Sequence, residues 1–128
     1  MSDEQIEQMI QEKGLNAPRV TPQRINDVIA SEHYFTAQDG VMGAYAAGGG
    51  VHPFGGTPCK ETHDALGLLT FCVLVLKNGF TVTGESACAS PKNFDPEVGR
   101  KAARQNAVNK IWALEGYLLK QALQEGAL

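Results

Sequence analysis

The chain has 128 residues and a mass of 13.7 kDa, which fits a single domain (1–128) with one core. Hydrophobic residues make up 43% and charged residues 20%, as in ordinary globular domains. The net charge of −3 argues against a general binder of DNA or of a membrane surface, because such proteins need a broad basic footprint. Any basic site must therefore be local.

The sequence contains few features that indicate a cellular compartment. Residues 1–14 are polar and acidic and lack the basic and apolar regions of a signal peptide. The longest apolar run, 66–76, is too short to cross a bilayer. Three cysteines, Cys59, Cys72 and Cys88, fit a reducing compartment better than a disulfide framework. These features predict a soluble intracellular protein.

Two helices are predicted near the start of the chain. The first spans about 1–16, where Ser2 and Gln5 form a capping-box pattern. Thr21 and Pro22 are typical of a second helix start, as N-cap and first helical residue. Apolar residues at positions 25, 28 and 29 then predict one buried stripe, and residues 32–36 follow as a helix exit or a short extended piece.

Residues 37–65 are rich in glycine and proline and show almost no hydrophobic periodicity. We predict a glycine-rich loop insertion here, and the composition favours a mobile insertion over an ordered binding loop. A phosphate-binding P-loop is excluded because its Lys-Ser/Thr ending is absent.

A β-hairpin is predicted with strands at about 67–77 and 80–89. Nearly every residue of the first strand is apolar, which indicates a strand covered on both faces. Asn-Gly at 78–79 is typical of a two-residue type I′ turn, which would pair Val75 with Val82.

The last helix is predicted over 96–124, because Asp95 and Pro96 are typical of a helix start. Its core-facing stripe is expected at Val98, Ala107, Ile111, Leu114 and Leu118. The element order predicts an α+β fold, an antiparallel sheet built on the hairpin and packed with two or three helices. Because two strands are unstable alone, further strands must come from residues 33–47 or from another subunit, and we expect a homo-oligomer for that reason.

Candidate metal ligands lie close in sequence at Cys59, His63 and Asp64, with His52 nearby. No Cys-x-x-Cys pair accompanies them, so solvated loop residues are the better interpretation and no metal is expected.

Catalytic patterns are also weak. Cys72 lies in the apolar strand, where burial makes a thiol inert, and no histidine near Cys88 or Ser86 could act as a base. Glu85 is the only carboxylate in the hairpin, so no carboxylate pair is present. We therefore expect no catalytic residues, and a nucleotide hydrolase that uses Glu85 stays open as an alternative.

An anion site is better supported. Arg100 and Arg104 share one helix face, with Lys101 beside them, in the first turns where the helix dipole favours a negative ligand. Further candidates are Ser86, Ser90 and Asn93 for neutral hydrogen bonds, Phe80 for stacking on a base, and Arg24 as a distant clamp. The alternative is a solvated basic face, with Arg100 paired to Glu97 or Asp95 and Phe80 an ordinary core aromatic.

Three blocks of sequence resemble a known family. They are "PRVTPQRINDVIASEHYFTA", "LGLLTFCVLVLKNGFTVTGESACASPKNFD" and "GRKAARQNAVNKIWALEGYLL". Together they resemble small phage and prophage proteins that include the type-one Thoeris anti-defence (Tad) proteins. The likeness leaves out the N-terminal helix and the glycine-rich loop.

The resemblance implies a molecular sponge in the host bacterial cytoplasm. Such proteins sequester cyclic ADP-ribose isomers made by bacterial TIR-domain enzymes and do not cleave them. Some members also bind cyclic di- or trinucleotides at separate pockets, and they assemble as dimers and hexamers. No cofactor is implied.

The resemblance also assigns roles to residues. Phe80 would stack on adenine, while Asn93, Arg24, Arg100 and Arg104 would hold phosphates or ribose hydroxyls at a subunit interface. Arg104 is preferred as the ligand arginine of the last helix. The hairpin tip and the helix start would then form one polar notch. A different class of function, direct inhibition of a host protein, would use the exposed loop with Tyr45, His52 and Phe54.

Overall fold

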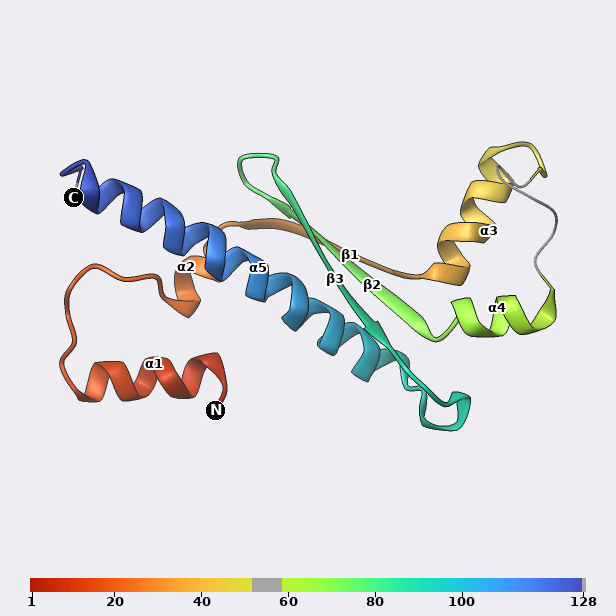
Figure 1. The fold of residues 1–128 in the computed structure, drawn as a ribbon, viewed down its shortest axis with the longest axis horizontal. Coiled ribbons are helices and arrows are strands. Elements are labelled where there is room, and N and C mark those ends of the chain that lie inside the picture. The colour runs from red at the N-terminus through yellow and green to blue at the C-terminus, as the bar shows by residue number, and fades with distance from the viewer. Residues whose placement is uncertain (52–58, 128) are drawn as a thin grey trace.

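The computed structural model describes residues 1–51 and 59–127, and its elements are named in Figure 1. A three-stranded antiparallel sheet has the order β1–β2–β3, with β1 at Ile29–Thr36, β2 at Leu69–Leu76 and β3 at Thr81–Ala87. The helices are α1 (Asp3–Glu12), α2 (Pro22–Asp27), α3 (Ala37–Ala47), α4 (Lys60–Leu66), the short 3₁₀ helix η1 (Pro91–Asn93) and α5 (Pro96–Gln124). The predicted α+β class is confirmed, with the longest helix at the C-terminal end.

The predicted helix starts are confirmed by their hydrogen bonds. Ser2 and Gln5 form a reciprocal capping box at the start of α1. The Thr21 hydroxyl accepts from the Arg24 backbone N–H at 3.1 Å, and the Asp95 carboxylate accepts from the Val98 N–H at 3.1 Å. These side chains satisfy N–H groups that have no partner inside the helix.

The predicted hairpin register is wrong by one residue. Leu76 and Phe80 close the turn, because the Leu76 N–H donates to the Phe80 carbonyl at 2.8 Å. This leaves a three-residue loop in which Gly79 takes a φ of 89°, as three-residue hairpins require. Val82 consequently pairs with Leu74. That register puts the apolar side chains of both strands on the same face of the sheet, and burial of that face decides it.

The third strand comes from the chain itself. Helix α2 ends at Asp27, and Ile29 begins β1, where a continuation of the helix was expected. β1 pairs antiparallel with β2, with Tyr34 opposite Cys72. The argument for a homo-oligomer from a missing strand is therefore removed.

The glycine-rich stretch is more regular than expected. It contains helices α3 and α4, and α3 begins with a capping box made by Thr36 and Asp39. Figure 1 shows the two helices projecting beyond the end of the sheet where β1 finishes. His52 and Phe54, named for a protein-binding loop, lie outside the described residues.

The core lies between α5 and one face of the sheet. In β2 every second residue is buried and the others are half-buried, so the strand is fully covered on one face only, contrary to expectation. The buried side of α5 is Ala103, Ala107, Val108 and Ile111. The predicted stripe is wrong at both ends of α5, since Val98, Leu114 and Leu118 are exposed. The helix is longer than the sheet that it crosses, and its C-terminal half runs past the sheet (Figure 1).

Candidate anion-binding cleft at the start of α5

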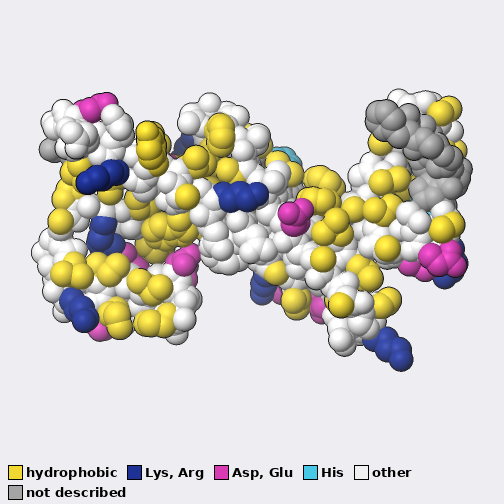
Figure 2. All heavy atoms as spheres, in the orientation of Figure 1, with side chains coloured by type: hydrophobic (Ala, Val, Ile, Leu, Met, Phe, Trp, Pro, Cys, Tyr) yellow, Lys and Arg dark blue, Asp and Glu magenta, His cyan; other side chains and the backbone are white. Residues whose placement is uncertain are grey.

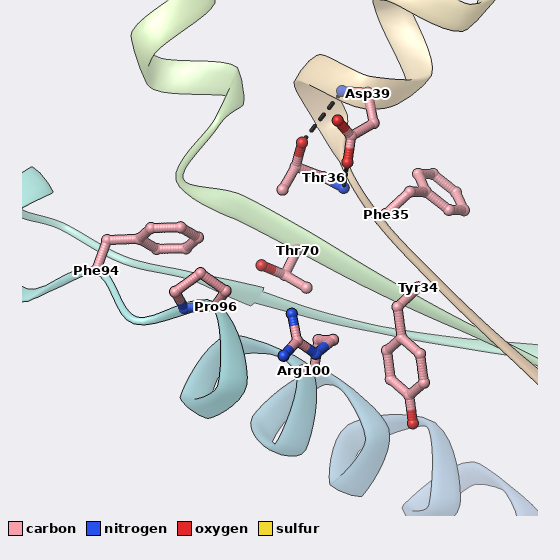
Figure 3. Close-up of a pocket in the computed structure, with 8 residues that line it drawn as sticks. All are labelled: Tyr34, Phe35, Thr36, Asp39, Thr70, Phe94, Pro96 and Arg100. Atoms are coloured by element: carbon pink, nitrogen blue, oxygen red, sulfur yellow. Dashed lines mark hydrogen bonds between the residues drawn. The ribbon is translucent and has the colours of Figure 1, made fainter.

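A cleft of 220 Å³ opens beside the first turns of α5. Figure 3 shows Arg100 rising from α5 toward Thr70, with Phe94 and Pro96 on one side and Tyr34 on the other. The complete lining is Tyr34, Phe35, Thr36, Asp39, Thr70, Phe94, Pro96 and Arg100. Side chains from β1, α3, β2 and α5 thus meet where α5 begins.

Arg100 carries a free positive charge in this cleft. Among the described residues, Glu97 pairs with Lys101 at 3.1 Å, and Asp95 is engaged in capping α5. The predicted alternative in which Arg100 pairs with either carboxylate is therefore wrong. Arg100 has no hydrogen-bond or ion-pair partner within the described part of the chain. Its guanidinium can donate parallel hydrogen bonds to a phosphate or carboxylate.

Thr70 contributes a buried hydroxyl to the wall of the cleft. The residue is 3% exposed, and its Oγ1 has no partner among the described residues. A methyl group on Gly99 would lie 2.9 Å from this oxygen, so the glycine in α5 leaves the space that the hydroxyl occupies. A buried hydroxyl without a partner is costly, because it has lost its hydrogen bonds to water.

We expect Thr70→Val to raise the free energy of unfolding by about 1 kcal/mol, because valine keeps the shape and removes the unpaired hydroxyl. Chemical denaturation of the ligand-free protein measures this change. Thr83→Val, at an exposed strand position, is the control and should leave stability unchanged. A clear loss of stability in Thr70→Val alone would mean that the hydroxyl has a partner in solution.

The aromatic side chains of the cleft are not equivalent. Phe35 stacks on Phe71, with ring centroids 5.6 Å apart, and its ring points away from Arg100 (Figure 3). Tyr34 donates its hydroxyl to Glu32 at 3.0 Å. Phe94 stands beside the cleft opening, half-buried, and offers the ring that is best placed for stacking.

Arg104, the preferred ligand arginine, is held by a carboxylate of its own chain. Its Nε donates to Glu32 at 2.5 Å, across 72 residues of sequence. Burial by itself would raise the pKa of Glu32, but the hydrogen bonds from Arg104 and Tyr34 outweigh it and hold that pKa below the usual value. A phosphate at Arg104 would have to compete with this internal anion.

The Glu32–Arg104 pair predicts a pH-dependent stability. Because the pKa of Glu32 is lowered from 4.5 in the folded chain, the contribution is complete at neutral pH and is lost as pH falls below that value. We expect Glu32→Gln to lower the Tm at pH 7, and we expect the Tm difference to shrink as the pH falls toward 3. Glu97→Gln, which removes an exposed pair, should change little at either pH. An equal Tm difference at both pH values would contradict the prediction.

The other predicted ligand residues lie apart from the cleft or at its rim. Phe80 lies at the hairpin tip beside Leu114 and Tyr117, at the opposite end of β3 from the start of α5. Arg24 pairs with Glu115 at 3.2 Å, on the later half of α5. The single notch expected from the hairpin tip and the helix start is therefore not formed within one chain, because β3 separates them by its whole length.

Ser90 and Asn93 remain near Arg100, in the segment that leads into α5. The Ser90 carbonyl accepts from the Asn93 N–H at 3.1 Å and from the Cys88 thiol at 3.2 Å. The Asn93 side chain is exposed just before Phe94. Of the six predicted ligand residues, Arg100 lines the cleft, and Ser90 and Asn93 lie in the segment that precedes α5 in sequence.

Apart from Arg100, the cleft residues had no predicted ligand role; they include Tyr34, Asp39, Thr70 and Phe94. Phe94 was the most accessible to sequence reasoning, since it stands two residues before Pro96 at the helix start. Thr70 carried a weaker signal, as a lone hydroxyl in an apolar strand. Asp39 carried none, because it falls in the stretch that was expected to be a loop.

The thiols and possible metal ligands lie elsewhere. Cys72 is fully buried, as predicted, and burial raises the pKa of its thiol. Cys59 is exposed, and a hydrogen bond with Thr62 lowers the pKa of its thiol. Within residues 1–51 and 59–127 no group of three His, Cys, Asp or Glu side chains is arranged to hold a metal ion.

The fold and the cleft define a small α+β domain with an aromatic-lined recess that contains Arg100, at the start of its longest helix. Residues 20–123 match the model of the phage protein (N4 Gp49/phage Sf6 gene 66) family. The match covers most of the chain, so this chain belongs to that phage protein family. It includes all three strands and leaves out α1.

Two further comparisons were negative. No curated protein and no solved structure shows a significant match to the chain. In the part of the chain that the structure describes, none of the helices combines the length and the apolar composition of a membrane span.

Proposed function

We propose that this phage protein binds and sequesters nucleotide signals of bacterial immunity without cleaving them. Membership in a phage protein family supports a role against the host. The resemblance to Thoeris anti-defence proteins makes cyclic ADP-ribose isomers the first candidates, and cyclic di- and trinucleotides of CBASS-type signalling the second. Sequestration in the host cytoplasm would keep the signal from its effector.

The observation that carries the proposal is the unpaired guanidinium of Arg100 in an aromatic-lined cleft. A phosphate would receive charge-assisted hydrogen bonds from Arg100, and a base would stack on Phe94. The exposed Asn93 adds a neutral hydrogen-bonding group in the segment just before Phe94. A phosphate next to a base is the ligand chemistry that uses all of these groups.

The size of the cleft sets what it can hold. Its 220 Å³ falls below the volume usual for a drug-sized ligand, so it would take one phosphate and part of a nucleoside. The rest of a cyclic ligand would extend over the rim. A sponge that competes with an effector needs roughly nanomolar affinity, about 12 kcal/mol, so contacts outside the cleft must contribute.

Binding without turnover also fits the groups around the cleft. The Asp39 carboxylate accepts from the Thr36 backbone N–H at 2.9 Å and is engaged as a helix cap. Glu85, the candidate base of a hydrolase, pairs with Phe71 on the sheet face opposite Gly84 and α5. None of the described cleft residues is a histidine.

Titration calorimetry against cyclic ADP-ribose isomers, cyclic dinucleotides and cyclic trinucleotides tests the proposal. We expect tight binding to at least one ligand class and recovery of the unchanged ligand after the protein is denatured by heat. Release of a hydrolysed product would replace the sponge by an enzyme, and Glu85→Gln would then show whether that carboxylate is the base. No binding to any ligand of the panel would instead favour direct inhibition of a host protein.

A further inference from the structure

Strand β1 lies at an edge of the sheet, and its outer side is unpaired. It spans eight residues, Ile29–Thr36, and β2 is its partner among the described strands. Helices α2 and α3 lie at its two ends (Figure 1). An unpaired strand edge is a template for a further strand, and proteins usually protect such an edge with lysine or proline. β1 contains neither residue type.

Successive residues of β2 direct their backbone groups to opposite sides. The Leu76 N–H donates to the Phe80 carbonyl, on the side of β3, at 2.8 Å. The N–H of the next residue, Lys77, donates to the carbonyl of Val28, just before β1, at 2.9 Å. Because this direction alternates along a strand, the even-numbered residues of β2 face β3 and the odd-numbered ones face β1.

Glu32 and Tyr34 therefore direct their backbone groups away from the sheet. Residues 31, 33 and 35 of β1 lie opposite odd-numbered residues of β2, so they face that strand. Glu32 and Tyr34 alternate with them, and their N–H and C=O groups point outward. The next outward N–H, that of Thr36, donates to the Asp39 carboxylate at 2.9 Å, as this alternation requires. The open part of the edge is thus formed by Glu32 and Tyr34.

The opposite edge of the sheet is better covered. By the same alternation Glu85 of β3 faces outward, and its carbonyl accepts from the Asn106 side chain of α5 at 2.8 Å. For the outward backbone groups of Glu32 and Tyr34, the described chain supplies no such hydrogen bond. A new strand would therefore find its free backbone partners on β1.

The side chains along this edge indicate which partner fits. Tyr34 lies opposite Cys72, which is part of the core beneath α5, so both side chains are on the α5 side of the sheet. A residue that paired with Tyr34 from outside would place its side chain on the same side, because directly opposite residues share a face. Arg100 lines the cleft that Tyr34 also lines, and it has no ion-pair partner in the described chain (Figure 3). An acidic side chain at this position would complement that charge.

The positive charge offered to a partner is local. On the face shown in Figure 2, Lys and Arg side chains are scattered among hydrophobic and acidic ones and do not form one broad patch. The matching partner is therefore a segment with a carboxylate at one defined position, and a long polyacidic tail would find few further cations.

We propose that β1 accepts an extended segment of another protein as a fourth strand, with an acidic side chain directed at Arg100. Backbone hydrogen bonds to Glu32 and Tyr34 would supply affinity, and the carboxylate would supply specificity. This interaction goes beyond nucleotide sequestration. Arg100 would serve either a phosphate or a protein carboxylate, and the two ligands would exclude each other.

A second copy of the chain fits this edge less well than a different protein. Glu32 is the only carboxylate in the sequence of β1, and Arg104 of the same chain already holds it. A second β1 would therefore bring no free carboxylate to Arg100. Charge complementarity favours a foreign segment.

A peptide with selective N-methylation tests strand addition. The probe is a fluorescent peptide as long as β1, made of alternating threonine and valine with glutamate in place of a central threonine, and anisotropy measures its affinity. N-methylation of the glutamate and of the residues two positions away should abolish binding, because their N–H groups must face β1. N-methylation of the intervening valines should leave affinity unchanged. Equal effects of the two patterns, or no binding of the unmodified peptide, would overturn the proposal.

Changes of charge test the contact with Arg100. Arg100→Met should weaken the glutamate peptide about tenfold and leave a glutamine version of the peptide unaffected, because the glutamine version has no carboxylate to lose. Lys101→Met is the control and should bind as the wild type does, since Lys101 is paired with Glu97. Wild-type affinity of Arg100→Met for the glutamate peptide would exclude the assigned contact.

A change in β1 itself separates the possible occupants of the edge. Tyr34→Pro removes the outward N–H and leaves the hydrogen bonds to β2, as proline does on edge strands. This variant should lose the peptide and keep the circular dichroism spectrum of the wild type. Sedimentation velocity of the protein alone covers the other occupant. A wild-type dimer that Tyr34→Pro converts to a monomer would assign the edge to a second copy and refute the proposal.

Discussion

Gly84→Ala is expected to cause the largest loss of stability among glycine-to-alanine changes in the described part of the chain. A Cβ at this position would lie 2.1 Å from the Ala103 carbonyl oxygen and 2.3 Å from the Ala107 nitrogen. Both are backbone atoms of α5, so no side chain can rotate away and the helix must move off the sheet. We expect a loss of about 3 kcal/mol in the free energy of unfolding, a large part of the stability of a small domain.

Chemical denaturation followed by circular dichroism measures the effect. Gly116→Ala is the control for a methyl group added to α5 itself, since no atom would meet its Cβ within 4 Å. That variant should be more stable by up to about 1 kcal/mol, because alanine is the better helix former. An unchanged denaturation midpoint in Gly84→Ala would mean that α5 does not pack as described.

Arg100→Met is expected to weaken ligand binding by about tenfold to hundredfold. The guanidinium has no internal partner, so its removal should cost one or more charge-assisted hydrogen bonds to the ligand and no contact within the chain. The denaturation midpoint should therefore stay at the wild-type value. Calorimetry with the tightest ligand of the panel, together with a denaturation curve, separates binding from stability.

Lys101→Met is the control for general electrostatics. Lys101 is the next residue along α5, carries the same charge and is paired with Glu97. Its loss should leave affinity almost unchanged. Equal weakening in both variants would point to a diffuse charge effect, and wild-type affinity in Arg100→Met would remove the cleft as the binding site. In the latter case Arg24 and Phe80 would be the next positions to change.

Much of the local structure could be predicted from short sequence signals. The bounds of α5 at 96 and 124 follow from Asp95 and Pro96 at the start and from the loss of regular signals near Gly126 at the end. The α1 capping box and the Thr21 cap could be predicted from the sequence equally well. In each case the determining interaction lies within a few residues of sequence. The existence of the hairpin could be predicted for the same reason.

The candidate cleft could be predicted only in part. Arg100 stood out because of its charge at a helix start, and Ser90 and Asn93 because they precede that start. Thr70 and Tyr34 come from two strands whose pairing the sequence did not reveal. Arg104 looked equivalent to Arg100, but Glu32, far away in sequence, pairs with it.

The sequence by itself determined where α1, α2 and α5 begin, that a hairpin follows residue 68, and that the chain resembles a family of phage proteins. These features rest on backbone conformation and on hydrogen bonds between near neighbours. Only the tertiary structure decided the hairpin register, the burial of one face of β2, and which arginine stays free. These three features depend on contacts between residues far apart in sequence. Two such contacts are the close approach of α5 to Gly84 and the ion pair between Glu32 and Arg104.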